Sequence, residues 1–138
     1  MSNLSDIMGG IETTLEGNVT GLKCYKYLPA TLNHFPATII IPDGLVLDPE
    51  QAFGGNSFQF SFRLRTFISS NDEETGWTQL VEMMDPTTAN KSIIKAIRTD
   101  PGLNGKADTS GITRLENVRH DEAGFSFDAI LEGYKSVA

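Results

Sequence analysis

The chain has 138 residues, of which 39% are hydrophobic and 21% charged, as is usual for one folded domain and not for a disordered segment. Its formal net charge is −7 at pH 7, so its overall field repels phosphates and argues against nucleic-acid recognition. Cys24 is the single cysteine, which excludes an intrachain disulfide. The first residues carry no secretion signal and no apolar run approaches membrane-spanning length, so we expect a soluble product with no membrane partner.

The first part of the chain predicts one helix, two strands and a long loop. Apolar residues recur every three or four positions over 4–15, which predicts a helix that Ser2 or Ser5 caps and that Gly17 stops. Strands are expected over 22–28 and 37–41, the second buried on both faces because it is continuously apolar. Residues 42–56 carry several turn signals and predict a long loop or protruding arm. The apolar side chains of this arm are Leu45, Val46, Leu47 and Phe53.

Residues 57–69, SFQFSFRLRTFIS, have the clearest pattern in the sequence. Apolar and polar residues alternate strictly, which predicts an antiparallel strand with one face on the core. The core face carries Phe58, Phe60, Phe62, Leu64 and Ile68. Arg63 and Arg65 point the other way.

The second part predicts two helices and two strands. A helix over 72–84 would bury Trp77, Leu80, Val81 and Met84, and a shorter helix would follow over 91–99. Closing strands are expected over 111–119 and 124–134, with Asp128 and Glu132 facing away from the core in the last. The order predicts a single α+β domain over residues 1–138, with a mostly antiparallel sheet of four or five strands and helices on one face.

The outward charges allow three interpretations. If the strand that carries Arg63 and Arg65 pairs with the strand that carries Asp128 and Glu132, opposite charges meet within the sheet and each pair contributes roughly 0.2–1 kcal/mol. If the two strands belong to different subunits, the same charges set the register of an interface. The simplest alternative is a solvated outer face.

No stretch of the sequence predicts catalysis. The motif GLNGK at 102–106 is similar to the end of a phosphate-binding loop, but it follows a helix and precedes a strand, whereas a phosphate loop requires the reverse order. His34 and His120 fall in loops and lie too far apart in sequence to favour a zinc site, and Cys24 is expected to be a core thiol. The sequence therefore predicts no enzyme, no cofactor and no metal, and favours a structural or interaction role.

Three segments together indicate a family. They are LSDIMGGIETTLEGNVTGLKCYKYLP at 4–29, IIIPDG at 39–44 and KSIIKAIRTDPGLNGKADTSGITRLENV at 91–118. The chain resembles the tail terminator proteins of long-tailed, siphovirus-type bacteriophages, especially those that infect actinobacteria. The most specific matches are Lys91, Ser92, Ile93, Ala96, Ile97, Asp100, Pro101, Leu103, Gly105, Ala107 and Asp108.

The resemblance implies a fold related to tail-tube proteins and a role in the virion. Such a protein forms a homohexameric ring on the head-proximal end of the tail tube, stops tube polymerisation and joins the tail to the head. Its partners would be its own copies, the tail tube protein and a neck or head-completion protein, with genome DNA passing through the lumen without sequence-specific binding. The candidate interface residues are Arg63, Arg65, Asp128, Glu132, Leu45, Val46, Leu47 and Phe53.

Two alternatives belong to other classes. One is a head-completion or neck protein of the same virion, which contact with the portal side and not with the tube would indicate. The other is an unrelated small enzyme or ligand-binding module, which would require a concave pocket with convergent polar groups.

Overall fold

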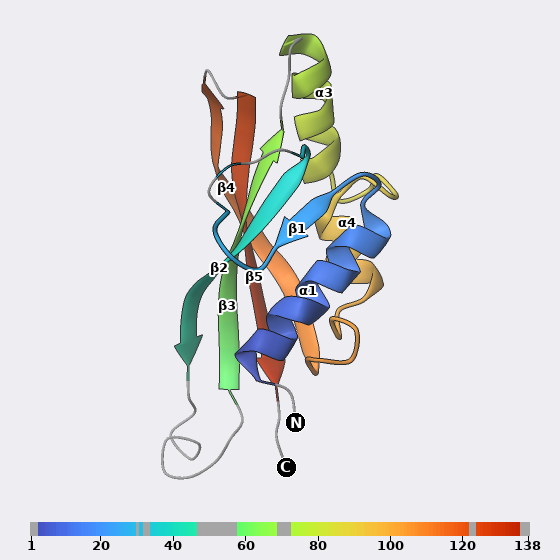
Figure 1. The fold of residues 1–138 in the computed structure, drawn as a ribbon. Helices are drawn as coiled ribbons and strands as arrows, with labels where there is room; N and C mark the ends of the chain where they lie inside the picture. Colours follow the sequence, from blue (N-terminus) through green and yellow to red (C-terminus); the bar gives the residue numbers. More distant parts are fainter. Residues whose placement is uncertain are drawn as a thin grey trace.

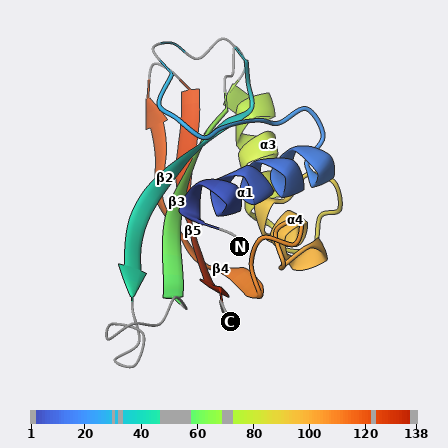
Figure 2. The same cartoon turned by 60° about the horizontal axis from the view of Figure 1, so that its bottom comes forward.

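The computed structural model describes residues 3–29, 31, 34–46, 58–68, 73–121 and 124–135. In this part of the chain, a five-stranded sheet of order β1-β2-β3-β5-β4 is covered by three helices on one side (Figures 1 and 2). The elements are α1 (Leu4–Asn18), β1 (Lys23–Tyr25), β2 (Ala37–Val46), β3 (Phe58–Ile68), α3 (Glu73–Met84), α4 (Ile93–Thr99), β4 (Thr109–Asp121) and β5 (Gly124–Lys135). Among the strands in the described ranges, only β1 and β2 pair in parallel. The predicted α+β fold is confirmed.

The centre of the sheet is the antiparallel pair of β3 and β5, in register from Phe58 opposite Lys135 to Ile68 opposite Phe125. Alternate residues of β3 are buried, as the sequence pattern predicts. The core-facing side chains of these two strands pack against the buried faces of the helices. The predicted strand over 57–69 is therefore confirmed almost to the residue.

Strand β2 is longer than the sequence predicts, and the predicted start of the arm at residue 42 is wrong. Pro42 to Val46 continue the pairing with β3, with an irregularity in register between Pro42 and Gly44. Because β1 covers only the first three residues of β2, Pro42 lies on an open edge where its missing N–H costs no ladder bond. The rest of the predicted arm, including Leu47 and Phe53, lies outside the described residues.

The buried face of α3 also differs from the prediction. Leu80 and Met83 are buried, but Trp77 is 56% and Val81 47% exposed. The helix packs through Gly76, Leu80 and Met83, spaced four and three residues apart, so Trp77 and Val81 lie on its flank. The predicted buried face of α3 was wrong because the small Gly76, and not Trp77, lies against the core.

Helix α1 begins at a different cap from the predicted serines. The side chain of Asn3 accepts a hydrogen bond from the N–H of Asp6, and the Asp6 carboxylate accepts one from the N–H of Asn3. This reciprocal capping box satisfies two backbone donors that the helix itself leaves unpaired.

The turn after α4 is packed tightly against α1. Leu103 and Asn104 adopt positive φ angles of 52° and 58°, and Leu103 is fully buried. A Cβ atom on Gly10 would overlap the carbonyl oxygen of Leu103, so the two backbones are in direct contact. Thr14 donates a hydrogen bond of 3.0 Å to the carboxylate of Asp100, which also accepts one of 2.9 Å from the N–H of Asn104. The glycine-containing motif at 102–106 is thus a packing turn between a helix and a strand.

We expect the two adjacent glycines of α1 to respond oppositely to alanine. Gly10→Ala forces the added methyl group into Leu103, and overpacking of this kind costs about 1–3 kcal/mol. Gly9→Ala is the matched control, because a Cβ there meets only the flexible end of Lys26 at 4.0 Å. It should stabilise the helix by about 0.5–1 kcal/mol. Urea unfolding measures both changes, and equal effects would contradict the packing of this turn.

Candidate functional site

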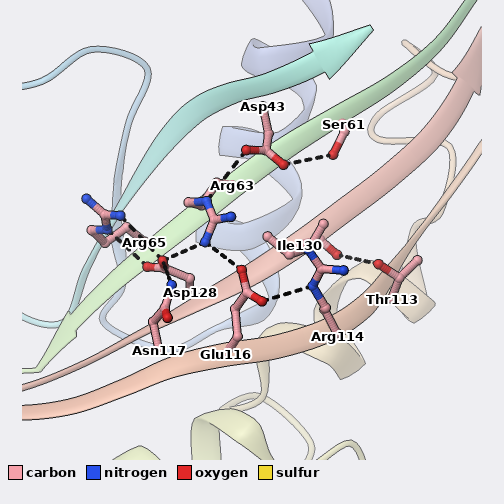
Figure 3. Close-up of polar contacts among 10 residues, drawn as sticks. All are labelled: Asp43, Ser61, Arg63, Arg65, Thr113, Arg114, Glu116, Asn117, Asp128 and Ile130. Atoms are coloured by element: carbon pink, nitrogen blue, oxygen red, sulfur yellow. Dashed lines mark hydrogen bonds and ion pairs between the residues drawn. The ribbon is translucent and has the colours of Figure 1, made fainter. Parts of the chain in front are cut away.

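The face of the sheet opposite the helices carries a charged network (Figure 3). Strand β3 supplies Arg63 and Arg65, β5 supplies Asp128, and β4 supplies Glu116 and Asn117. The strand register places Arg65 and Glu116 on either side of Asp128 in one row across the sheet. Side chains from three neighbouring strands therefore converge on one carboxylate.

Asp128 is the centre of this network and is only 2% exposed. It accepts hydrogen bonds from Arg65 Nε at 3.0 Å, Arg63 Nη1 at 2.8 Å and Asn117 Nδ2 at 2.9 Å. Burying a carboxylate is costly unless it is paired and hydrogen-bonded, and here both conditions are met.

The network is balanced in charge. Arg63 also contacts Glu116 at 2.7 Å and Asp43 at 3.6 Å, and Arg114 contacts Glu116 at 3.0 Å. Its members are the cations of Arg63, Arg65 and Arg114 and the carboxylates of Asp43, Glu116 and Asp128. Three cations and three carboxylates leave no net charge for an outside partner to neutralise.

Asn117 reaches Asp128 because β4 bulges at this point. The register of β4 against β5 shifts between Glu116 and Arg119, and Asn117 adopts a positive φ of 55°. A bulge of this kind changes the direction in which a side chain points, and here it directs Asn117 toward Asp128. Asn117 was not predicted as part of the site. An Asn inside a predicted strand could have indicated a bulge, since Asn tolerates the left-handed region of backbone conformation better than most residues.

The pKa of Asp128 reflects two opposing effects. Burial raises it, but the hydrogen bonds from Arg65, Asn117 and Arg63 outweigh burial and bring the pKa below its usual value of 3.8. The hydrogen bonds to Asp128 and Glu116 raise the pKa of Arg63 further above its ordinary value. Asp128 and Arg63 are therefore both ionised at neutral pH.

Some of the predicted interface residues form ion pairs with one another, and others do not. Arg63, Arg65 and Asp128 pair within one chain, which confirms the first of the three interpretations for these residues. Glu132 lies opposite Ser61, is exposed, and forms no ion pair with other described residues. A subunit contact at Glu132 stays a prediction.

The apolar half of the predicted interface is described only in part. Leu45 is exposed near the end of β2. Val46 is the last residue of that strand, and its side chain, like Leu47 and Phe53, lies outside the described residues. Leu45 and Glu132 line a common hollow of about 300 Å³, together with Asp43, Gly44, Gln59, Phe60, Ser61 and Gly133.

The remaining candidate side chains are engaged in packing. Burial raises the pKa of the Cys24 thiol, and the carboxylates of Glu12 and Glu16 raise it further, so the thiol stays protonated and poorly nucleophilic at neutral pH. His34 contacts the carbonyl oxygen of Gly21 at 2.8 Å. The ring of His120 stacks on that of Phe125 with 4.3 Å between centroids.

Within the described residues, no cluster of His, Cys, Asp and Glu side chains is arranged to hold a metal ion. None of the helices described there combines the length and apolar character needed to cross a bilayer. Comparisons with protein-family models and with curated proteins give no match.

Removing the central carboxylate should destabilise the fold. Asp128→Ala leaves two guanidinium groups without their shared partner, and loss of hydrogen bonds between charged groups costs about 1.5–3 kcal/mol. Glu132→Ala, on the same face of the same strand, is the control and should change the free energy of unfolding by less than about 0.5 kcal/mol. Urea denaturation provides the measurement; similar losses for the two variants would show that the network contributes little.

The network should also make the free energy of unfolding depend on pH. Because the pKa of Asp128 is lower in the folded chain than the ordinary 3.8, its contribution is complete above that value and is lost as the pH falls through the folded pKa. We expect the stability difference between the wild type and Asp128→Asn to shrink from about pH 5 to about pH 3. Hydrogen bonds from Thr87 also lower the pKa of Asp85. Because Asp85 is present in both proteins, its contribution to the pH dependence cancels in the difference. A difference that does not change with pH would contradict this assignment.

Proposed function

We propose that this chain is a structural virion protein, a tail terminator that forms a ring on the head-proximal end of a phage tail tube, stops tube growth and joins the tail to the head. The observation that carries the proposal is the structure of residues 91–108, where the resemblance is most specific. Ser92 caps α4 by accepting a hydrogen bond of 3.2 Å from the N–H of Lys95. The apolar matches Ile93, Ala96, Ile97, Leu103 and Ala107 are all buried.

The polar matches in this segment also have structural roles. Asp100 joins α1 to the turn through Thr14 and Asn104, and Gly105 adopts a positive φ of 80°. Residues with such roles are hard to replace without changing the turn. A resemblance concentrated on them supports a shared fold, and the shared fold supports the proposed place in the tail.

The charge of the chain agrees with a DNA conduit. A net charge of −7 repels phosphates, so a lumen of this character would let the genome slide through without adhering. A ring of identical subunits requires two different complementary surfaces on each copy. Arg63, Arg65 and Asp128 pair within the chain, and a subunit contact on this face of the sheet stays a prediction.

The proposal predicts that the purified protein limits tube growth. Tube protein of the same phage would be polymerised with increasing amounts of this chain and measured by electron microscopy. We expect shorter tubes with extra density at one end only, because a cap blocks further addition at that end. An unrelated protein of similar size and net charge is the control.

Unchanged tube lengths would contradict the terminator function. Binding to portal or neck protein without binding to tubes would instead favour the head-completion alternative.

A further inference from the structure

The chain turns tightly after α4, at Asn104 and Gly105. The N–H of Lys106 donates a hydrogen bond of 3.2 Å to the carbonyl oxygen of Leu103, and the two residues between them have φ angles of 58° and 80°. Positive φ at both central positions is characteristic of a type I′ turn, which favours the dipeptide Asn-Gly. Asn104-Gly105 is the only Asn-Gly dipeptide in the sequence.

The same dipeptide is chemically labile. Asparagine is a thermolabile residue, and a glycine that follows it leaves the next backbone nitrogen unhindered because glycine has no Cβ. Both reacting groups are accessible here, since Asn104 and Gly105 are exposed. Within the described ranges, neither the side-chain amide of Asn104 nor the N–H of Gly105 forms a hydrogen bond.

The closed turn keeps these two groups apart. To react, the nitrogen of Gly105 must approach Cγ of Asn104, which requires a negative ψ angle at Asn104 that places the nitrogen on the side of Cβ. In a type I′ turn the ψ angle at this position is positive, about 30°, and the nitrogen points away from Cβ. The turn must therefore open before the two groups can meet.

Contacts with α1 hold the turn closed. The carboxylate of Asp100 accepts a hydrogen bond of 2.9 Å from the N–H of Asn104 and one of 3.0 Å from the hydroxyl of Thr14. Leu103 is fully buried, and its carbonyl oxygen occupies the space that a Cβ atom on Gly10 would need. Opening of the turn therefore disrupts its packing against α1, which makes the open turn a minor local state of the fold.

We propose that Asn104 is a site of spontaneous deamidation, and that its rate is set by how often the turn opens. In the open turn, the nitrogen of Gly105 attacks Cγ of the Asn104 side chain. A bond from this nitrogen to Cγ forms, the bond from Cγ to the amide nitrogen breaks, and ammonia leaves with the proton that the Gly105 nitrogen loses. Water then hydrolyses the cyclic imide at one of its two carbonyl groups, which gives aspartate or isoaspartate. This inference does not depend on the proposed function.

Either product should weaken the turn. Aspartate places a carboxylate on the residue whose N–H is bonded to the carboxylate of Asp100, and like charges repel. Isoaspartate adds a carbon atom to the backbone, so that a type I′ turn no longer fits this segment. Because the turn positions α1 beside α4 and β4, we expect the modified chain to unfold at a lower denaturant concentration than the unmodified chain.

The test follows the mass of the tryptic fragment 99–106 while the folded protein is kept in a mildly alkaline buffer. Deamidation replaces NH₂ by OH and raises this mass by about one dalton. A parallel sample in guanidinium chloride gives the rate without the turn, and we expect it to be at least about 10-fold faster. Asn90 is the matched control in the same chain, since it is exposed and has a positive φ of 64° but precedes Lys91. It should stay unmodified in the folded protein.

Two variants loosen the closed turn without changing the reacting residues. Gly10→Ala strains the packing of the turn and should accelerate deamidation about 5-fold or more. Thr14→Val is a milder second variant, which removes one hydrogen bond to Asp100 and should accelerate the reaction about 2-fold or more. Gly9→Ala is the control, because a Cβ there does not meet the turn, and it should react like the wild type.

Three outcomes would overturn the inference. They are an Asn104 that stays intact in guanidinium chloride, equal rates in the folded and the unfolded protein, and turn variants that react no faster than Gly9→Ala. Deamidation of Asn90 as fast as that of Asn104 in the folded protein would also contradict it. The isoaspartate form, separated by ion exchange, should unfold at a lower guanidinium concentration; an unchanged midpoint would show that the turn tolerates the product.

Discussion

The antiparallel pairing of β3 with β5 constrains both faces of the sheet at once. In the observed register, Phe60, Phe62 and Phe127 lie in the core beneath the helices, while Asp128 lies opposite Arg65 on the other face. A slip of one residue between the two strands would reverse the faces of one strand relative to the other, so that either Phe60 and Phe62 or Phe127 would leave the core. The apolar and the charged residues therefore select the same register, one by burial and the other by pairing.

The helix layer depends on a different kind of contact. Gly10 lets α1 approach the turn at Leu103 at backbone distance, and the hydrogen bond from Thr14 to Asp100 fixes the helix beside that turn. The segment that carries the resemblance is therefore a structural element, which positions α1, α4 and β4 relative to one another.

The sequence predicted the elements whose pattern matches their environment. Strand β3 alternates because one of its faces is core, and its position and outward residues were predicted correctly. In β5 the outward Ser126, Asp128 and Glu132 were also predicted correctly, although the strand is buried on both faces from Phe127 to Leu131. Opposite charges on the two strands were recognised, but strand order decides whether they meet, and a sequence pattern does not contain strand order.

The failures have local physical causes. The sequence predicts that the strand ends at residue 41 and that Pro42 begins the arm, yet an open sheet edge tolerates a residue without an N–H. Trp77 was placed in the core on its hydrophobicity, whereas the neighbouring Gly76 faces inward. Asn117 was missed because a bulge, not the alternation of the strand, directs it to Asp128.

The proposed terminator function is tested by the distribution of tail lengths in lysates of a phage that lacks the gene, imaged by negative-stain electron microscopy. If the protein ends the tail tube, we expect overlong tails that are not joined to heads, beside heads filled with DNA. Tails of normal length that fail to join heads would contradict it and would place the protein in the neck instead.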